Sequence, residues 1–237
     1  MTSKEYGALF LLSALWGGSF LFMRIAAPAL GPIVLIELRV GLAALALLAY
    51  GLLIGKVPEF RRHWRAYAVA GAVNSAFPFL LFSTAALYIP ASLMATLNAT
   101  TPLWGVIVAA IWLRETLTVR KVAGLLLGFA GVATLVGLGP VALTPSVLLG
   151  CGAALLASFL YANGAVYVKV NLQGVDSRAI ATYSQLFAAL LILPLVPFAI
   201  PSQPPTAVVT ASVLALSLLS TALAYLLFFY LILQAGP

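Results

Sequence analysis

The positively charged residues of this chain lie in alternate gaps between long uncharged stretches. Of the 12 Lys and Arg residues, only Arg24 and Arg39 depart from this arrangement. The others are Lys4, Lys56, Arg61, Arg62, Arg65, Arg114, Arg120, Lys121, Lys169 and Arg178. The remaining gaps, near residues 88–91, 139–146 and 201–206, contain neither Lys nor Arg. Because cytoplasmic loops of membrane proteins collect Lys and Arg, the pattern predicts an integral membrane protein whose N-terminus and basic gaps are cytoplasmic.

The uncharged stretches are long enough to hold transmembrane helices. Only 7% of the residues are charged and 64% are hydrophobic, a balance that the surface of a soluble domain cannot accommodate. A spanning helix needs roughly 20 apolar residues, and residues 66–113, 122–168 and 179–237 contain no charged side chain. Each of these stretches therefore holds two helices. With two earlier segments, the sequence predicts an all-α protein of eight visible helices, at residues 6–26, 32–54, 66–87, 91–113, 121–138, 146–168, 178–200 and 208–233.

Charge placement and cysteine content exclude several classes of protein. The net charge of +7 comes from residues that flank helices and form no continuous patch, so no nucleic-acid partner is expected. Cys151 is the single cysteine, which rules out a disulfide framework. The first apolar stretch continues past Trp16 and Phe20 without a small-residue cleavage site and is interpreted as a retained helix. The only histidine, His63, lies in a basic gap, and no metal-ligand spacing exists, so we expect neither an enzyme nor a cofactor.

The chain resembles itself at a shift of about 145 residues. Ser13–Trp16 lines up with Ser158–Tyr161, and Asn74–Ser75 with Ser220–Thr221. Five predicted helices separate the two copies, so the second copy must be inverted relative to the first. Inverted repeats of this kind are a recurrent plan of secondary transporters.

The same alignment predicts the domain organisation. Pro237 corresponds to Ala91, which begins the fourth predicted helix, so the second copy has no counterpart of the fourth and fifth helices. We therefore expect two inverted five-helix repeats, a first at residues 1–139 and an incomplete second at residues 146–237. On this reading the intact protein has ten helices, and this chain is a C-terminal truncation or a fragment of a longer gene.

Several local motifs, taken in order, resemble the EamA family of the drug/metabolite transporter superfamily. The motifs are Leu15–Phe20 with Arg24, Leu38–Ala44, Ala91–Leu93, Thr101–Leu103, Leu113–Glu115, Gly124–Val132 and the tail Ala224–Tyr230. The resemblance covers essentially the whole chain. It implies ten helices, cytoplasmic termini and a central substrate cavity between the two repeats.

The resemblance also implies a function. It indicates a secondary, ATP-independent transporter of the bacterial inner membrane, an exporter of small organic metabolites such as amino acids or drug-like compounds by alternating access. The chain has no GxxxxGK[ST] loop that could bind ATP. Protons are a candidate coupling ion, and a monomer and a homodimer are both compatible with the sequence. A channel or a lipid flippase on the same scaffold is the alternative.

Two asparagines within predicted helices are candidates for substrate binding. Asn74 is four residues before Pro78, and Asn98 is four residues before Pro102. Because proline removes the helical hydrogen bond to the carbonyl four residues earlier, both carbonyls are predicted to be free near mid-membrane. The hydroxyl of Thr101 would add to the second polar spot. The alternative is that these side chains only bond between helices.

Aromatic and polar residues at related places in other helices complete the expected cavity wall. These candidates are Trp16, Ser19, Tyr161, Asn163, Gln185 and Tyr225. Aromatic walls with a few polar groups suit an amphipathic organic ligand. The alternative for the aromatic members is packing or an interfacial belt.

Charged residues of the helices are candidates for gating or ion pairs. Arg24, Glu37 and Arg39 are expected toward the outer side, where either of the latter two could pair with Arg24, or where the arginines could reach the outer surface. Glu115 is expected to pair with basic residues near the cytoplasmic end of its helix. Separately, Gly124, Gly128 and Gly131 predict a small-residue face that packs closely against another helix.

Overall fold

The computed structural model describes residues 3–55, 60–137, 142 and 144–235. Sequence inferences that depend on Lys56, Gly139 and Pro237 lie outside these residues. Every regular element of the described chain is helical, so the predicted all-α fold is confirmed.

The elements follow one another as consecutive helices, several of which join end to end. They are α1 (Ser3–Leu53), α2 (Trp64–Gly71), the π-helical η1 (Ala72–Ala76), α3 (Phe77–Tyr88), α4 (Ala91–Asn98), α5 (Thr101–Trp112), α6 (Val119–Gly137), α7 (Pro145–Asn171), α8 (Ser177–Ile192), the 3₁₀-helical η2 (Leu193–Phe198), α9 (Ala207–Leu214), the π-helical η3 (Ala215–Leu223) and α10 (Ala224–Ala235). Among the described residues they form 7 helical segments long and apolar enough to cross a membrane. The chain is an integral membrane protein.

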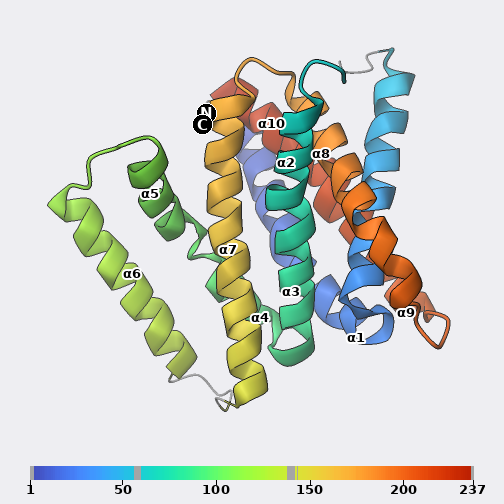
Figure 1. Cartoon of the computed structure of the whole chain (residues 1–237), viewed down its shortest axis with the longest axis horizontal. Helices are drawn as coiled ribbons and strands as arrows, with labels where there is room; N and C mark the ends of the chain where they lie inside the picture. The colour runs from blue at the N-terminus through green and yellow to red at the C-terminus, as the bar shows by residue number, and fades with distance from the viewer. Residues whose placement is uncertain (1–2, 56–59, 138–141, 143, 236–237) are drawn as a thin grey trace.

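The expected count of eight separate helices is not matched, because the first two predicted helices run into each other in α1. Gly31 has φ 71° and ψ 159°, a conformation that essentially only glycine adopts, and Pro28 and Pro32 flank it. Figure 1 shows the chain reversing its direction in α1, so that its two halves run along the bundle in opposite senses. A reversal at one glycine leaves no loop between the halves, so the two helices predicted at residues 6–26 and 32–54 follow each other directly.

Capping side chains define where several helices begin. Thr144 precedes Pro145 and accepts a hydrogen bond from the backbone N–H of Val147 at 3.3 Å, which fixes the start of α7. The Asp176 carboxylate accepts one from the N–H of Arg178 at 2.9 Å at the start of α8. These caps hold the connections at the two ends of the bundle.

The basic segments lie together at one end of the bundle. Figure 1 shows the beginning of α2, the end of α5, the beginning of α8 and the last turn of α10 at this end, whereas the reversal in α1 and the α3–α4 connection lie at the other. Arg62, Arg114 and Arg178 belong to the first group of segments. The alternate gaps that hold Lys and Arg in the sequence therefore lie at one end of the folded molecule, which we call the basic end.

The core lies between α1, α3, α7 and α9. Large side chains of α3, such as Phe79 and Phe82, and small ones of α7, such as Ala154 and Ala157, belong to the same buried cluster. By contrast, α5 and α6 stand at the edge of the bundle (Figure 1), and no described residue of α6 is buried. Small residues on one side of a contact let the helix backbones approach closely, which holds helices together in a membrane.

The small-residue face predicted on α6 is not a packing surface in the structure. A Cβ atom added at Gly124 or Gly131 would meet nothing within 4 Å. Only Gly128 approaches a neighbour, with an added Cβ 2.8 Å from the Leu103 side chain of α5. The glycines do lie at helical spacing, but spacing alone does not show whether that face of the helix has a neighbour.

Candidate functional site

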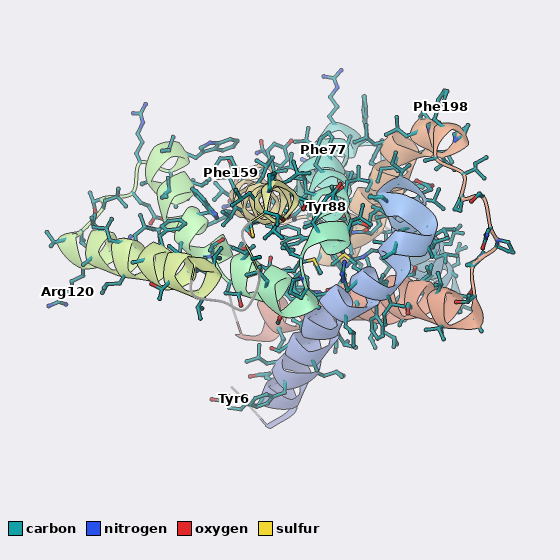
Figure 2. All side chains as sticks on the ribbon, turned by 90° about the horizontal axis from the view of Figure 1, so that it is seen from below. Tyr6, Phe77, Tyr88, Arg120, Phe159 and Phe198 are labelled. Atoms are coloured by element: carbon teal, nitrogen blue, oxygen red, sulfur yellow. The ribbon has the colours of Figure 1, made fainter. Side chains whose placement is uncertain are left out.

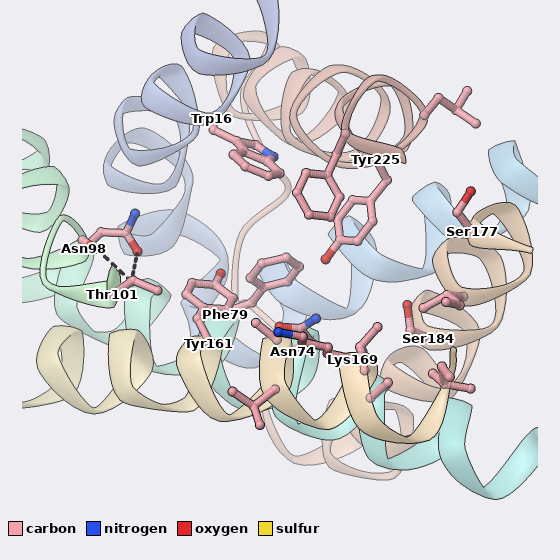
Figure 3. A pocket seen from close by; sticks show the side chains of 18 of the residues that line it. Trp16, Asn74, Phe79, Asn98, Thr101, Tyr161, Lys169, Ser177, Ser184 and Tyr225 are labelled. Atoms are coloured by element: carbon pink, nitrogen blue, oxygen red, sulfur yellow. Dashed lines mark hydrogen bonds between the residues drawn. The ribbon is translucent and has the colours of Figure 1, made fainter. Parts of the chain in front are cut away.

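A cavity of about 1500 Å³ lies among α1, α3, α4, α5, α7, α8 and α10. Of the residues predicted to take part in binding or gating, those on its wall are Trp16, Ser19, Arg39, Asn74, Asn98, Thr101, Glu115, Tyr161 and Tyr225. The others, which do not line it, are Arg24, Glu37, Asn163 and Gln185. Figure 3 shows that Trp16, Tyr161, Tyr225, Asn74 and Asn98 face a common space, although they come from distant parts of the chain.

The cavity opens toward the basic end of the bundle. Its wall includes residues 172–178, which connect α7 to α8 at that end, together with Tyr50 and Leu113. None of the described residues in the turns at the opposite end lines it. There, buried side chains such as Ile89 and Met94 fill the space between the helices. The described chain therefore encloses a space that is closed on one side.

The wall on one side is a broken helix. The helical span from Ala91 to Trp112 is interrupted between the end of α4 at Asn98 and the beginning of α5 at Thr101, just before Pro102. The Asn98 carbonyl is not left free as predicted, because the Thr101 hydroxyl donates to it at 2.7 Å. The Asn98 Nδ2 donates to none of the described residues, and Asn98 lines the cavity (Figure 3). A ligand can therefore bond to this amide.

A π-helical segment, η1, places Asn74 on the wall. It ends just before Pro78, so the wider turns occur where the proline disturbs the helical hydrogen bonds. The Asn74 side chain lies against α7, and a Cβ added at Gly164 would come within 2.6 Å of Asn74 Oδ1. Gly164 therefore makes the room that Asn74 needs. Gly164 belongs to no sequence motif, so nothing in the sequence singled it out.

Gln185 was predicted to line the cavity, but it is fully buried behind the cavity wall. Its Nε2 donates to Ser75 Oγ at 2.9 Å, and Ser75 Oγ lies 3.5 Å from the Tyr225 hydroxyl. Gln185 thus positions Ser75 and Tyr225. Asn163 also points elsewhere, since its Nδ2 donates to the Phe159 carbonyl of its own helix at 2.8 Å.

The second π-helical segment, η3, carries polar groups to α1. Ser220 lines the cavity and donates to the Leu15 carbonyl at 2.8 Å. Thr221 donates to the Leu216 carbonyl, five residues earlier, at 2.8 Å, and accepts a hydrogen bond from Arg39 Nε at 2.9 Å. The bond over five residues is the spacing of a π-helix, and such segments are frequent at functional sites.

Aromatic rings form the apolar part of the wall. Tyr161 stacks on Phe82 with ring centres 5.9 Å apart, and Phe79 lies edge-on to Tyr161 at 6.3 Å. Trp16 packs against Phe228 with ring centres 5.4 Å apart. Phe79 and Phe82 were not predicted to line the cavity, although their spacing places them on the same helix face as Ser75. An aromatic wall of this kind accommodates a flat apolar group.

The charged residues of α1 do not form the ion pair that the sequence suggested. Arg24 donates to the Ala86 carbonyl of α3, and Glu37 forms no ion pair with it among the described residues. Arg39 does not extend to the outer surface either, because it is only 3% exposed and faces η3. Its helix is apolar on all sides, so the sequence could not indicate which face is internal.

The charges at the basic end are arranged differently. Glu115 Oε2 lies 3.4 Å from Lys121 Nζ, so the predicted pairing of Glu115 with a nearby basic residue is present. Asp176 Oδ2 lies 2.8 Å from Arg178 Nη2. Both pairs are partly exposed to solvent, and in Figure 2 Arg120 extends away from the helices in the same way. Exposed pairs of this kind contribute at most about 1 kcal/mol each.

Comparison with known proteins gives a family match over most of the chain. The sequence profile described as the EamA-like transporter family matches residues 4–137 and 148–237. The "Uncharacterized transporter YvbV" of Bacillus subtilis (strain 168) is 29% identical, over 71% of this chain and 55% of that protein. An "Uncharacterized transporter" of Archaeoglobus fulgidus is 28% identical, over 99% of this chain and 82% of that protein.

A solved structure shares the fold. It is described only as the crystal structure of a protein, and it aligns with a TM-score of 0.72 at 21% identity. The alignment covers 100% of this chain and 81% of that chain. The Bacillus relative is longer than the matched region, so this chain spans about half of its length.

Proposed function

This chain belongs to the EamA-like transporter family, and we propose that it is a secondary transporter that carries small organic molecules through the described cavity by alternating access. The observation that carries the proposal is the one-sided cavity. A carrier presents its site to one side of the membrane at a time, whereas a channel needs a path through to both. The broken α4–α5 helix also fits, because secondary transporters often bind substrate at interrupted helices.

We propose the orientation that places the basic end in the cytoplasm, with the N-terminus on the same side, in the inner membrane of a bacterium. In that orientation the cavity opens to the cytoplasm, where an exporter loads its substrate. Single cysteines for Arg62 and Gln203, in a Cys151→Ser background, test this. In inside-out vesicles, an impermeant maleimide should label position 62 and spare position 203. The reverse labelling would overturn the orientation and, with it, the argument for export.

The two-repeat organisation, residues 1–139 and 146–237, remains part of the proposal. In its support, η1 and η3 occur at the positions that the internal alignment pairs, Asn74–Ser75 with Ser220–Thr221. The family profile also matches in two stretches. Inverted repeats supply two similar halves that can rock against each other around a central site.

Protons are the coupling ion that we propose. Glu37 is half-buried within α1, and its Oε2 is buried without a hydrogen-bond partner among the described residues. A carboxylate in this situation is expensive when charged. Taking up a proton would relieve that cost, so we expect transport to respond to a pH gradient. A transport rate that is independent of the gradient would remove protons from the proposal.

Counterflow in proteoliposomes tests the transport function itself. Vesicles loaded with a candidate metabolite should accumulate its labelled form transiently, and the initial rate should saturate with external concentration. A lipid flippase would instead move labelled phospholipid, and a channel would give a flux that rises without saturating. Either of those results would replace the carrier proposal. Vesicles without protein provide the baseline.

A further inference from the structure

Arg39 is a buried guanidinium with hydrogen-bonding capacity left over. It is 3% exposed, yet it lines the cavity. Its Nε donates to Thr221 Oγ1 at 2.9 Å, and its Nη1 lies 3.6 Å from Met23 Sδ, a weak acceptor. A guanidinium has five N–H groups. Its Nη2 therefore has no acceptor among the described residues, and a ligand in the cavity can bind there.

The charge of Arg39 is also uncompensated. None of the acidic side chains in the described residues forms an ion pair with it. Glu115 and Asp176 line the cavity as well, but at its open end, where each pairs with a basic residue of its own. Glu37 is two residues from Arg39 on the same helix and so points in a different direction. The described residues thus supply no counter-ion at the closed end of the cavity.

The surroundings of Arg39 orient it without neutralising it. Its Cζ lies 3.7 Å from the centre of the Phe79 ring, so the guanidinium stacks on an aromatic face and its plane is fixed. A buried cation without an anion is costly within a membrane. An anion that accepts two hydrogen bonds from a pre-oriented guanidinium would remove much of that cost.

We propose that Arg39 determines substrate specificity, and that the substrate is an organic acid. Its carboxylate would accept hydrogen bonds from the free N–H groups of Arg39, and its apolar body would rest against Phe79, Phe82 and Tyr161. Neutral compounds of the same shape leave the guanidinium unpaired, and cations are repelled by it. This inference rests on the proposed transport function and narrows its substrate class.

A series of ligands that differ only in charge tests the proposal. The probes are 3-phenylpropanoate, 3-phenylpropanamide and 3-phenylpropylamine, titrated into the purified full chain in detergent and followed by calorimetry. The acid should bind on the order of 10- to 100-fold more tightly than the amide, because a charge-assisted hydrogen bond is worth about 1.5–3 kcal/mol. The amine should bind most weakly. Equal binding of acid and amide, or no binding of the acid at millimolar concentration, would overturn the proposal.

Variants assign the preference to this residue. Arg39→Met should abolish the difference between acid and amide, and Arg39→Lys should restore only part of it, because lysine lacks the planar fork. Arg24→Met makes the same change on the same helix away from the cavity and should keep the preference. A preference that survives in a folded Arg39→Met protein would refute the assignment. Should Arg39→Met not fold, Arg39→Lys makes the assignment, and an undiminished preference in Arg39→Lys would refute it.

Binding and transport can fail separately. If the labelled acid binds through Arg39 but is not carried into proteoliposomes, the transport function is wrong and the anion site stands. If the acid is carried at the same rate by the unaltered chain and by Arg39→Met, transport stands and the role of Arg39 is wrong.

Discussion

The helices around the cavity and the α5–α6 pair are packed in different ways. Where α2 meets α8, the backbones come so close that only a hydrogen atom fits. A Cβ at Gly71 would lie 2.4 Å from the Ser184 carbonyl oxygen. In α6, by contrast, a Cβ at Gly124 would meet nothing within 4 Å, and no described side chain is buried. Glycines of similar appearance in the sequence therefore do different things in the two regions.

The difference shows what holds this bundle together. Lipid is as apolar as the helix surfaces, so helices associate through close packing and hydrogen bonds rather than through apolar burial alone. The contact of α2 and η1 with α8 has both, since Gly71 of α2 packs closely against α8 and Gln185 of α8 donates a hydrogen bond to Ser75 of η1. The α5–α6 contact includes Leu103 against Gly128 and Trp104 against Phe129, and no described residue of α6 is buried. We expect the first contact to limit stability and the second to contribute little.

The largest effect is expected from Gly71→Val. The added side chain meets backbone atoms of α8, which cannot rotate away, so α2 and α8 must separate. Overpacking of this kind typically costs 1–3 kcal/mol or more, and the melting temperature in detergent should fall markedly. Gly105→Val, in α5 where an added Cβ meets nothing within 4 Å, is the matched control. Equal melting temperatures for the two variants would mean that the α2–α8 contact is not tight.

A smaller and more specific effect is expected from Gly164→Ala. Its Cβ would meet the Asn74 side chain, which can move, so the fold should tolerate the change at a cost of about 1 kcal/mol. Displacing Asn74 alters the cavity wall, however, and the transport rate per folded molecule should fall several-fold. Gly152→Ala on the same helix has open space and should change neither quantity. An unaltered rate in Gly164→Ala would separate Asn74 from the transport path.

Parts of the site could be predicted because they follow from local chemistry. Prolines four residues after Asn74 and Asn98 predicted disturbed helices, and the structure has a π-helical segment at the first and a break at the second. Thr101 satisfies the Asn98 carbonyl, a bond within one turn that the spacing already allowed. Short-range rules of this kind need no knowledge of the neighbouring helices.

The positions of several side chains could not be predicted, because they depend on which face of a helix points into the bundle. A membrane helix is apolar toward lipid and toward its neighbours, so periodicity does not distinguish the two. Arg39 was therefore expected near the surface and Gln185 in the cavity, whereas the structure places Arg39 on the cavity wall and buries Gln185 behind it. Gly71 and Gly164 belong to no motif, yet they make the closest contacts, whereas two of the regularly spaced glycines of α6, Gly124 and Gly131, have open space beside them.

The smallest effect is expected on α6. Gly124→Leu and Gly131→Leu each place a side chain in open space, and leucine favours the helix over glycine by somewhat under 1 kcal/mol. The melting temperature of the isolated chain should stay the same or rise slightly. A fall in melting temperature, accompanied by a smaller particle mass in light scattering, would instead mean that another copy of the chain covers this face. In that case the face of α6 would also be tightly packed in the oligomer, and the difference in packing between the two regions would exist only in the monomer.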